Sequence, residues 1–496
     1  MKHPPNTKKN VENLILVITL LLVFNIATNT PSDFDMWWHL RAGNEMWDQG
    51  KILLQDTFSY TRNGAPWVNA FWISDLGMYG IVKFGGFFAL TVIVSLVAVA
   101  VMVILLLRLE GPIYLRAPLI LIAMFAAGIN WSPRPQIMSF LLLAGLDYFL
   151  YHHHHVKRGQ LWILIPLFAI WGNLHGGFIW GILALIATIV GDLFDHALNN
   201  QPVLSLKETG QLTLWSMAAG SAVLINPNGL AIWKLPFYQV HVSLTSITEW
   251  LSPDFHDFYT HPVLWLLFLL IIGLGFSKKR PSFAELFKGI GFTYMLFVAQ
   301  RNIAPYVIII TPIAGRQLAS ALEIFKESPL VQKLKTIKFF SQDTSKPLPG
   351  RTNFTLNIFI VSILTVFFLL NAYIFALPAK INAKVPVKAV EWIKENHPDG
   401  QIFNSYNWGG YLIWELRDYP VFIDGRADLY GDEILSEWGE IINGTGKGLA
   451  LLDKYKVNLI FLEPKYALLE KLSEHGWEKA FSDSQITIYL RQPPMP

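Results

Sequence analysis

The stretch VENLILVITLLLVFNIATNTPSDFDMWWHLRAG, residues 11–43, decides the fold of this chain. Its first part is an apolar run of nearly the length that a membrane-spanning helix needs. The loop that follows opens with two acids, Asp33 and Asp35. The run lacks the small-residue cleavage site of a secretory signal peptide and more apolar runs follow, so it is predicted to be a retained first helix. A dense polar cluster therefore lies directly beside the membrane.

The composition of the whole chain is that of a membrane protein. Of its 496 residues, 53% are hydrophobic and 15% are charged, and the mean hydropathy is +0.38. Soluble proteins of this size seldom have such values. The net charge of +3 is too small to indicate a nucleic-acid-binding surface, so no nucleic acid is expected as a partner. The chain has no cysteine, which excludes disulfides, thiolate metal sites and cysteine nucleophiles.

Apolar segments recur over residues 1–376, and about eleven of them approach the length that crossing a bilayer requires. They are centred on residues 12–28, 88–107, 117–130, 137–151, 161–173, 177–195, 212–226, 261–276, 284–300, 303–320 and 354–376. If the N-terminus is cytoplasmic, most lysines and arginines fall in cytoplasmic loops, as the positive-inside rule requires. The prediction is an α-helical multi-pass domain over residues 1–376 in the inner or plasma membrane, with a first outer loop at 29–87.

Residues 377–496 are more polar, and an odd number of spans places them on the extracytoplasmic side. The segment VKAVEWIKENH has helical spacing, and four short runs are predicted strands: QIFNS, PVFID, VNLIFLE and QITIYLR. Helical stretches near 408–416, 433–441, 447–455 and 465–474 separate them. Residues 377–496 are therefore predicted to form a small extracytoplasmic α/β domain.

The predicted topology gathers the unusual polar residues in the outer loops. Acids and histidines that converge on a membrane interface from several loops indicate a binding or catalytic site. The candidates are Asp33, Asp35 and His39 in the first outer loop, Arg134 in SPRPQ, His175 in NLHGG, Glu249 and Asp254 in TEWLSPDFHD, and Arg301 in QRN.

Asp35 and His39 are four residues apart, so on a helix they share one face. A carboxylate beside an imidazole can act as a general base or contribute to a metal site. The structural alternative is that Asp33 caps an interfacial helix. For Trp37, Trp38 and Trp47 an aromatic belt at the membrane interface is the prediction.

Arg134 lies between two prolines in a short loop, which suits rigid phosphate binding, although an arginine that snorkels to lipid headgroups has the same position. Arg301, at the end of a span, needs an anion, either a protein acid or a ligand phosphate. Asp56 is predicted to be a turn or cap residue. The sequence Asp424-Gly-Arg426 follows a predicted strand, where ligands often bind, but a tight turn closed by an internal Asp–Arg pair is the prediction.

Several features together resemble the GT-C superfamily of integral-membrane glycosyltransferases. A first helix leads straight into a long outer loop that begins with acids, the number of spans is similar, and a soluble domain follows the last span. The stretches DFDMWWHLRAG, SPRPQ, NLHGGF, NPNG, EWLSPD, NWGGYL and VFIDGRADLYG look like those of a bacterial branch related to protein mannosyltransferases and lipid A aminoarabinose transferases.

The resemblance implies a sugar donor carried on a polyprenyl phosphate, an acceptor that is a glycan, lipid or protein, and transfer with inversion. It also implies an essential acid in the first outer loop, by position Asp35 or Asp33. Arg134, Arg301 and His175 are candidates for the leaving phosphate. Some members of the superfamily need a divalent cation such as Mg²⁺ or Mn²⁺; here Asp35 and His39 would be its ligands, and the cofactor stays open.

Two other classes of protein remain. A transporter of lipid-linked sugars would carry charged residues and broken helices near the membrane midplane, whereas here they collect at the outer edge. A non-catalytic assembly or receptor protein would use its outer domain to bind a partner. For such a protein Asp35 would be dispensable and the outer domain essential.

Overall fold

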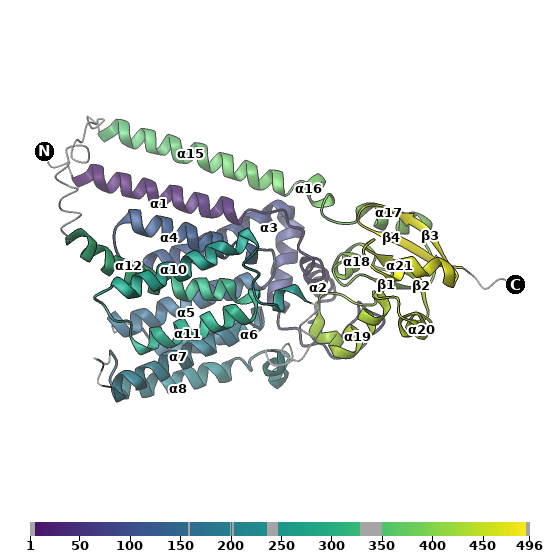
Figure 1. Cartoon of the computed structure of the whole chain (residues 1–496), viewed down its shortest axis with the longest axis horizontal. Coiled ribbons are helices and arrows are strands. Elements are labelled where there is room, and N and C mark those ends of the chain that lie inside the picture. Colours follow the sequence, from purple (N-terminus) through teal and green to yellow (C-terminus); the bar gives the residue numbers. More distant parts are fainter. Residues whose placement is uncertain are drawn as a thin grey trace.

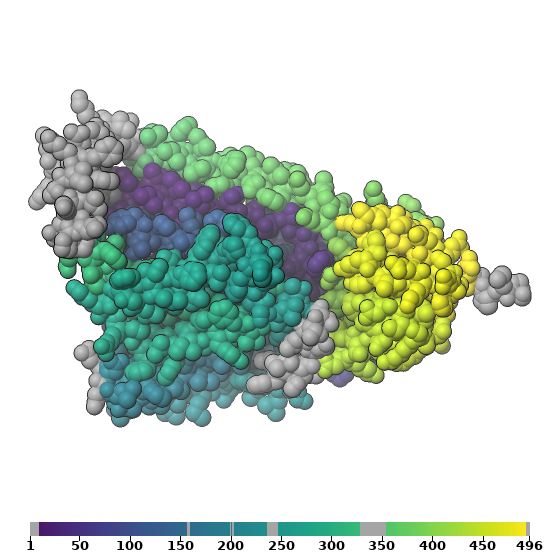
Figure 2. All heavy atoms as spheres, in the orientation of Figure 1, coloured from purple at the N-terminus to yellow at the C-terminus, as the bar shows by residue number. Residues whose placement is uncertain are grey.

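The structure is a computed structural model that describes residues 5–156, 159–198, 200, 203–235, 247–327 and 350–492. Long helices lie side by side in one half of the molecule, and a small sheet flanked by helices forms the other half (Figure 1). The second half caps one end of the helix bundle (Figure 2).

Each predicted apolar segment coincides largely with one helix, although α4 and α6 have only 14 and 11 residues. The helices of the bundle and its loops are α1 (Pro5–Ala27), α2 (Met36–Gln49), α3 (Trp72–Arg108), α4 (Ile113–Ala126), α5 (Gln136–Val156), α6 (Leu164–Leu174), α7 (Phe178–Ala197), α8 (Leu206–Ala222), α10 (His261–Phe276), α11 (Phe283–Val298), α12 (Ile303–Glu327) and α15 (Gly350–Phe375). Among the described residues, six helices are long and apolar enough to cross a membrane, namely α1, α3, α7, α10, α12 and α15. The chain is therefore a helical membrane protein, as predicted.

The long helix α3 contains a kink that separates the first outer loop from the bundle. Gly86 has φ 64° and ψ −172°, a conformation that side chains with a Cβ rarely adopt. Residues 72–85 continue the outer loop as a helix, and the predicted span at 88–107 begins just after the kink. Glycine thus joins a helical segment of the outer loop to the span that follows it.

The C-terminal region is the predicted small α/β domain. Its elements are α16 (Pro378–Asn382), α17 (Val387–Asn396), β1 (Gln401–Asn404), α18 (Gly409–Glu415), α19 (Ala427–Ile442), α20 (Gly446–Lys454), β2 (Val457–Leu462), α21 (Leu468–Lys471), β3 (Trp477–Ser482) and β4 (Thr487–Arg491). The strand order is β1-β2-β4-β3, with β1 parallel to β2 and the other two pairs antiparallel. The predicted boundary at residues 376 and 377 falls between α15 and α16.

One predicted strand is wrong and one strand was not predicted. The segment PVFID forms no strand, because its backbone partners lie outside the sheet. The Asn404 side chain accepts from Phe422 N–H at 2.8 Å and donates to the carbonyl of Ile423 at 2.7 Å. The neighbouring Val421 exchanges backbone bonds with Phe58 and Tyr60 of the first outer loop. The missed strand β3 is a half-exposed edge strand that lacks an apolar run.

The first outer loop shares a hydrophobic core with the C-terminal domain. Met36 and Leu40 of α2 belong to the same buried cluster as Leu459 and Phe461 of β2. The intervening residue Ile460 faces the opposite side of the sheet, where α19 and α20 pack. This alternation is that of a strand buried on both faces, and one of these faces shares its core with α2.

The predicted aromatic belt is wrong for two of its three members. Trp37 and Trp38 are only 3% and 4% exposed, inside the core that α2 shares with the C-terminal domain. Trp37 packs edge-to-face on Tyr411 of α18, with ring centroids 5.0 Å apart. Trp47 is exposed. The sequence showed amphipathic rings beside the membrane, but it did not show that a distant domain covers them.

Candidate active site

A cavity of about 630 Å³ lies where the bundle meets the C-terminal domain. Side chains of the bundle and its loops form one wall: Asp33, Asp35, Trp38, His39, Arg134, His175, Glu249, Trp250 and Arg301. The C-terminal domain forms the other: Tyr406, Asn407, Gly425, Arg426, Asp428, Ser436, Trp438, Lys465 and Tyr466. All predicted site residues except Asp254 therefore reach one cavity.

Arg134 is the centre of the charged wall. Its guanidinium contacts three carboxylates: Nε lies 3.3 Å from Asp33, Nη1 lies 3.0 Å from Asp35, and Nη2 lies 2.7 Å from Glu249. The Arg134 side chain is 12% exposed, whereas those of the three acids are 19%, 27% and 43% exposed. Arg134 is thus bound by acids that remain open to the cavity, and it does not snorkel to headgroups.

A second cation stands beside this cluster. The Arg301 guanidinium stacks on the Trp250 ring at 4.2 Å from its centroid, and its charge is felt by Glu249. Burial opposes ionisation of Glu249, but the charge and hydrogen bond of Arg134 outweigh it and lower the pKa of Glu249. Arg134 therefore binds Glu249, whose carboxylate form is stabilised, together with Asp33 and Asp35 of the first outer loop.

Asp35 is the acid whose ionisation is most finely balanced. Burial beneath the cavity wall raises its pKa to about 7, against the opposing charge of Arg134. The neighbouring charges of Asp33 and Glu249 raise it further. A carboxyl group with a pKa near neutrality can both take up and release a proton at physiological pH, which is what general acid–base chemistry needs.

The C-terminal domain holds Asp35 in place. A Cβ added at Gly425 would lie 1.8 Å from Asp35 Oδ1, so the turn after Asp424 leaves room only for glycine. The indole N–H of Trp38 donates to the same oxygen at 3.2 Å. Asp35 is thus fixed by Trp38, by Arg134 and by a backbone turn almost four hundred residues away in sequence.

His39 lies in the cavity wall, but its partner is not Asp35. Its Nδ1 is 2.6 Å from Asp75 Oδ1, and both side chains are buried. Burial and the charge of Arg134 lower the pKa of His39 well below its usual value, so the ring is neutral. The hydrogen bond with the Asp75 carboxyl occupies Nδ1, which leaves Nε2 as the second ring nitrogen.

His175 is held in one tautomer by its backbone partner. Its Nδ1 accepts the backbone N–H of Gly177 at 2.9 Å and lies 2.8 Å from Ser139 Oγ. Burial and the charge of Arg301 lower the pKa of His175 to about 3. The ring is therefore neutral with its proton on Nε2, a hydrogen-bond donor available at the cavity wall. A Cβ at Gly177 would lie 2.5 Å from Ser139 Oγ, so glycine is needed at this position because the two segments pack closely.

Asp254 lies elsewhere. Its side chain is 62% exposed and accepts from the backbone and ring of His256, both at less than 3 Å. Asp254 does not line the cavity, so the structure does not support its predicted role in substrate binding.

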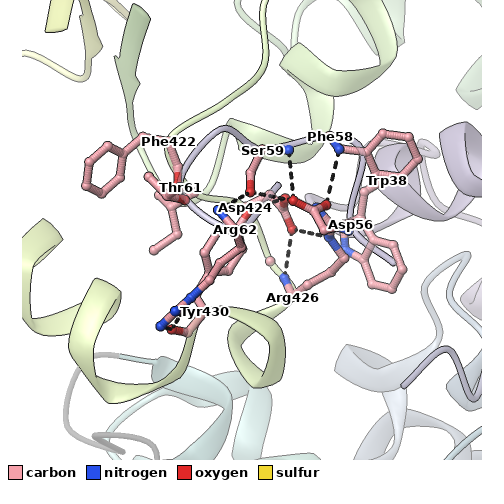
Figure 3. Close-up of polar contacts among 12 residues, drawn as sticks. Trp38, Asp56, Phe58, Ser59, Thr61, Arg62, Phe422, Asp424, Arg426 and Tyr430 are labelled. Atoms are coloured by element: carbon pink, nitrogen blue, oxygen red, sulfur yellow. Dashed lines mark hydrogen bonds and ion pairs between the residues drawn. The ribbon is translucent and has the colours of Figure 1, made fainter. Parts of the chain in front are cut away.

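The predicted Asp424–Arg426 pair is confirmed, and it is larger than predicted (Figure 3). Arg426 donates to both oxygens of Asp424 at 2.8 and 2.7 Å and also contacts Asp56 at 2.8 Å. Asp56 is the predicted turn residue, because it accepts from the backbone N–H groups of Phe58 and Ser59. The cluster therefore fastens the first outer loop to the C-terminal domain.

Sequence reasoning missed the second wall of the cavity. Tyr406 and Asp428 belong to the conspicuous stretches YNWGGYL and FIDGRADLYG, but no spacing rule connects them with Asp35. Burial raises the pKa of Asp428 to about 6. Trp438, Lys465 and Tyr466 carried no signal.

The carboxylates of the cavity do not form a metal site as arranged. Among the described residues, no three His, Cys, Asp or Glu side chains are grouped to hold a metal ion. Asp33, Asp35 and Glu249 direct oxygens at Arg134, and His39 is bound to Asp75. The residues present therefore do not fit the predicted pairing of Asp35 with His39 as ligands.

Comparisons with known proteins identify the fold. No protein-family model and no curated protein matches the chain. The oligosaccharyltransferase of Archaeoglobus fulgidus, in its apo form, matches with a TM-score of 0.55 and 15% identity over 91% of this chain and 69% of that chain. The archaeal oligosaccharyltransferase AglB from the same organism, in complex with an inhibitory peptide and a dolichol-phosphate, matches with a TM-score of 0.54 and 14% identity over 99% and 75%.

ArnT from Cupriavidus metallidurans, bound to undecaprenyl phosphate, covers 96% of this chain and 97% of its own at 12% identity, but its TM-score of 0.47 is too low to carry an argument. The chain therefore has the fold of the archaeal oligosaccharyltransferase, in line with the sequence resemblance to the GT-C superfamily.

Proposed function

We propose that this protein is a membrane glycosyltransferase that moves a sugar from a polyprenyl-phosphate donor to an acceptor. The reaction would take place on the side of the membrane that carries the C-terminal domain, which we infer to be extracytoplasmic. The observation that carries the proposal is Asp35, a carboxyl group with a pKa near 7 held beside two arginines in the cavity. The GT-C fold supports it, and the AglB structure contains a dolichol-phosphate, which is a lipid carrier of this kind.

In this mechanism Asp35 is the general base. Its carboxylate takes the proton of an acceptor hydroxyl or amide, and the acceptor atom attacks the anomeric carbon of the donor sugar. The bond from that carbon to the phosphate oxygen breaks on the opposite face, so the configuration inverts. The bonding electrons leave with the polyprenyl phosphate, whose negative charge grows as the bond breaks.

Arg134 and Arg301 are the groups that meet this growing charge. Both line the cavity, and both lie close to Glu249. The neutral His175 adds an N–H donor without adding charge. The phosphate would compete with Glu249 for Arg134, because a guanidinium binds phosphate and carboxylate oxygens with the same two-pronged geometry.

A divalent cation, Mg²⁺ or Mn²⁺, stays a prediction, and no step above depends on it. It would supply Lewis-acid stabilisation of the phosphate if it bound. Comparing sugar transfer in EDTA with transfer after Mg²⁺ or Mn²⁺ is added back tests this directly.

The first experiment asks whether the protein cleaves a lipid-linked sugar. Purified protein in lipid nanodiscs is incubated with radiolabelled polyprenyl-phosphate sugars, and label that leaves the lipid is measured. We expect release from one donor, reduced by about 10²- to 10⁴-fold in Asp35→Asn, which is the usual contribution of a general base.

Asp254→Asn is the matched control, since it makes the same substitution at an exposed acid that lies outside the cavity. A folded Asp35→Asn protein with full activity would contradict the mechanism. If no donor in the panel is bound or cleaved, the non-catalytic receptor hypothesis, with the C-terminal domain as the partner-binding part, becomes the better account. Binding of a donor in nanodiscs without release, together with its transport across the bilayer of sealed proteoliposomes, would favour the transporter.

A further inference from the structure

The C-terminal wall of the cavity differs in chemistry from the charged wall. Three aromatic side chains, Tyr406, Trp438 and Tyr466, line it in a row. The ring centroids of Tyr406 and Trp438 are 6.1 Å apart, and those of Trp438 and Tyr466 are 6.0 Å apart. The interplanar angles are 59° and 82°, so neighbouring rings meet tilted or edge-to-face and form one contiguous aromatic surface on this wall.

This row starts beside the reacting acid. The Tyr406 hydroxyl donates to the carbonyl of Gly425 at 3.2 Å, and Gly425 is the residue that touches Asp35. The Trp438 indole N–H donates to the carbonyl of Asn404 at 3.1 Å, which fixes the middle ring to the end of β1. The row therefore begins next to Asp35, and its middle ring is fixed to the end of β1.

Polar side chains stand among the rings. Asn407, Asp428 and Ser436 line the same wall, and the Lys465 ammonium lies 5.1 Å from the centroid of the Tyr466 ring. Half-buried aromatic faces interleaved with amide, carboxyl and hydroxyl groups are poorly suited to a prenyl chain, which offers no hydrogen bonds. They suit a ligand that has both an apolar face and a rim of hydroxyl groups.

We propose that this row binds the pyranose rings of a carbohydrate chain, with the ring nearest Tyr406 placed for reaction at Asp35. A pyranose presents C–H groups on one face, which pack on aromatic rings, and hydroxyl groups around its edge, which bind polar side chains. The inference rests on the proposed function and deepens it, because it names the class of ligand that fills the second wall.

The carbohydrate has two possible sources, the donor and the acceptor. The row is longer than one ring, so a donor that carries a single sugar would occupy only its inner end. The outer rings would then bind an acceptor glycan, whereas a donor that carries an oligosaccharide would fill the whole row.

The binding test uses the full-length protein in nanodiscs and a panel of neutral di- to tetrasaccharides of glucose, galactose, mannose and N-acetylglucosamine. Binding is measured by calorimetry and by saturation-transfer NMR. We expect one member to bind, and Trp438→Ala to weaken it by about tenfold, the effect of losing one aromatic contact of about 1.4 kcal/mol.

Trp392→Ala is the matched control, since Trp392 is a half-buried tryptophan of the same domain that packs on Phe481 and does not line the cavity. Trp438→Phe keeps a ring face and should recover part of the affinity, and Tyr466→Ala tests the outer end if Trp438→Ala does not fold. Equal binding by wild type, Trp438→Phe and Tyr466→Ala, or no binding of any saccharide, overturns the inference. Binding of a peptide in place of saccharides overturns it as well.

Donor cleavage measured in the same preparations separates the two sources and the two proposals. If Trp438→Ala releases donor sugar normally but no longer transfers it, the row holds the acceptor; if cleavage of an oligosaccharide donor falls as well, it holds the donor. Asp35-dependent cleavage without saccharide binding contradicts only this inference. Saccharide binding that depends on Trp438, with no cleavage of any donor, contradicts only the proposed transfer.

Discussion

Two arginines of this protein are each surrounded by acids, and they differ in what surrounds the acids. Arg134 holds Asp33, Asp35 and Glu249 at the edge of a cavity, where the acids are 19% to 43% exposed. Arg426 holds Asp56 and Asp424, both at 0% exposure, beneath the same cavity. The same chemistry thus makes an exchangeable cluster in one place and a closed one in the other.

The comparison shows why one cluster suits reaction and the other stability. An acid on Arg134 can be replaced by a ligand oxygen from the cavity. Removing a partner from Arg426 strands a charge in the interior, which is among the most destabilising changes known in proteins. Figure 3 also shows Arg62, from the same loop as Asp56, which donates to the backbone carbonyl of Tyr430.

The largest effect on stability is expected from Arg426→Met. It leaves two buried carboxylates without a cation, and breaking such a pair costs about 3–5 kcal/mol. Thermal unfolding and limited proteolysis of the C-terminal domain measure the loss. Arg134→Met is the contrasting variant, since its acids can be solvated through the cavity. Equal destabilisation by both variants would contradict the distinction between the two clusters.

Gly425→Ala tests the contact between the clusters. The new methyl group would overlap Asp35 Oδ1, and overpacking of this kind costs about 1–3 kcal/mol. We expect sugar release to fall because Asp35 is displaced. Gly446→Ala, where a Cβ meets nothing within 4 Å, is the control. A Gly425→Ala protein with unchanged stability and activity would show that the turn does not position Asp35.

The raised pKa of Asp35 predicts a pH dependence. As a base it must be ionised, so kcat/KM should rise about tenfold per pH unit below pH 7 and level off above it. For stability the sign is opposite. The folded state keeps a proton on Asp35 that the unfolded state, with a pKa near 3.8, has lost, so Asp35 makes stability fall as pH rises from about 4 to about 7.

Denaturation of wild type and Asp35→Asn at pH 5 and pH 8 measures this effect. The variant should gain stability relative to wild type at pH 8. A constant difference between the two proteins across this range would mean that the pKa of Asp35 is not raised.

The smallest effect is expected from Asp254→Asn. Asp254 was a predicted substrate-binding acid, but its side chain binds His256 at the surface. We expect unchanged donor release and an unchanged unfolding midpoint. A loss of donor release comparable to that of Glu249→Gln would mean that Asp254 acts in the reaction although it lies outside the cavity.

Much of the site could be predicted because its residues stand out locally. Acids after a first apolar helix, an arginine between prolines and a histidine before two glycines are rare at membrane edges, where charge is costly. Periodicity gave the long helices and three of the four strands. It failed for PVFID, whose backbone partners are the Asn404 side chain and a loop more than three hundred residues away.

The sequence by itself determined that this is a helical membrane protein with a small α/β domain and with acids and arginines at one membrane edge, because hydrophobic length and charge are local properties of the chain. The tertiary structure alone decided which acids meet which arginine, that Trp37 and Trp38 are core residues, and that an aromatic wall faces Asp35. Those outcomes depend on packing between segments that lie from 99 to more than 360 residues apart, and packing of that kind leaves no periodic pattern in either segment.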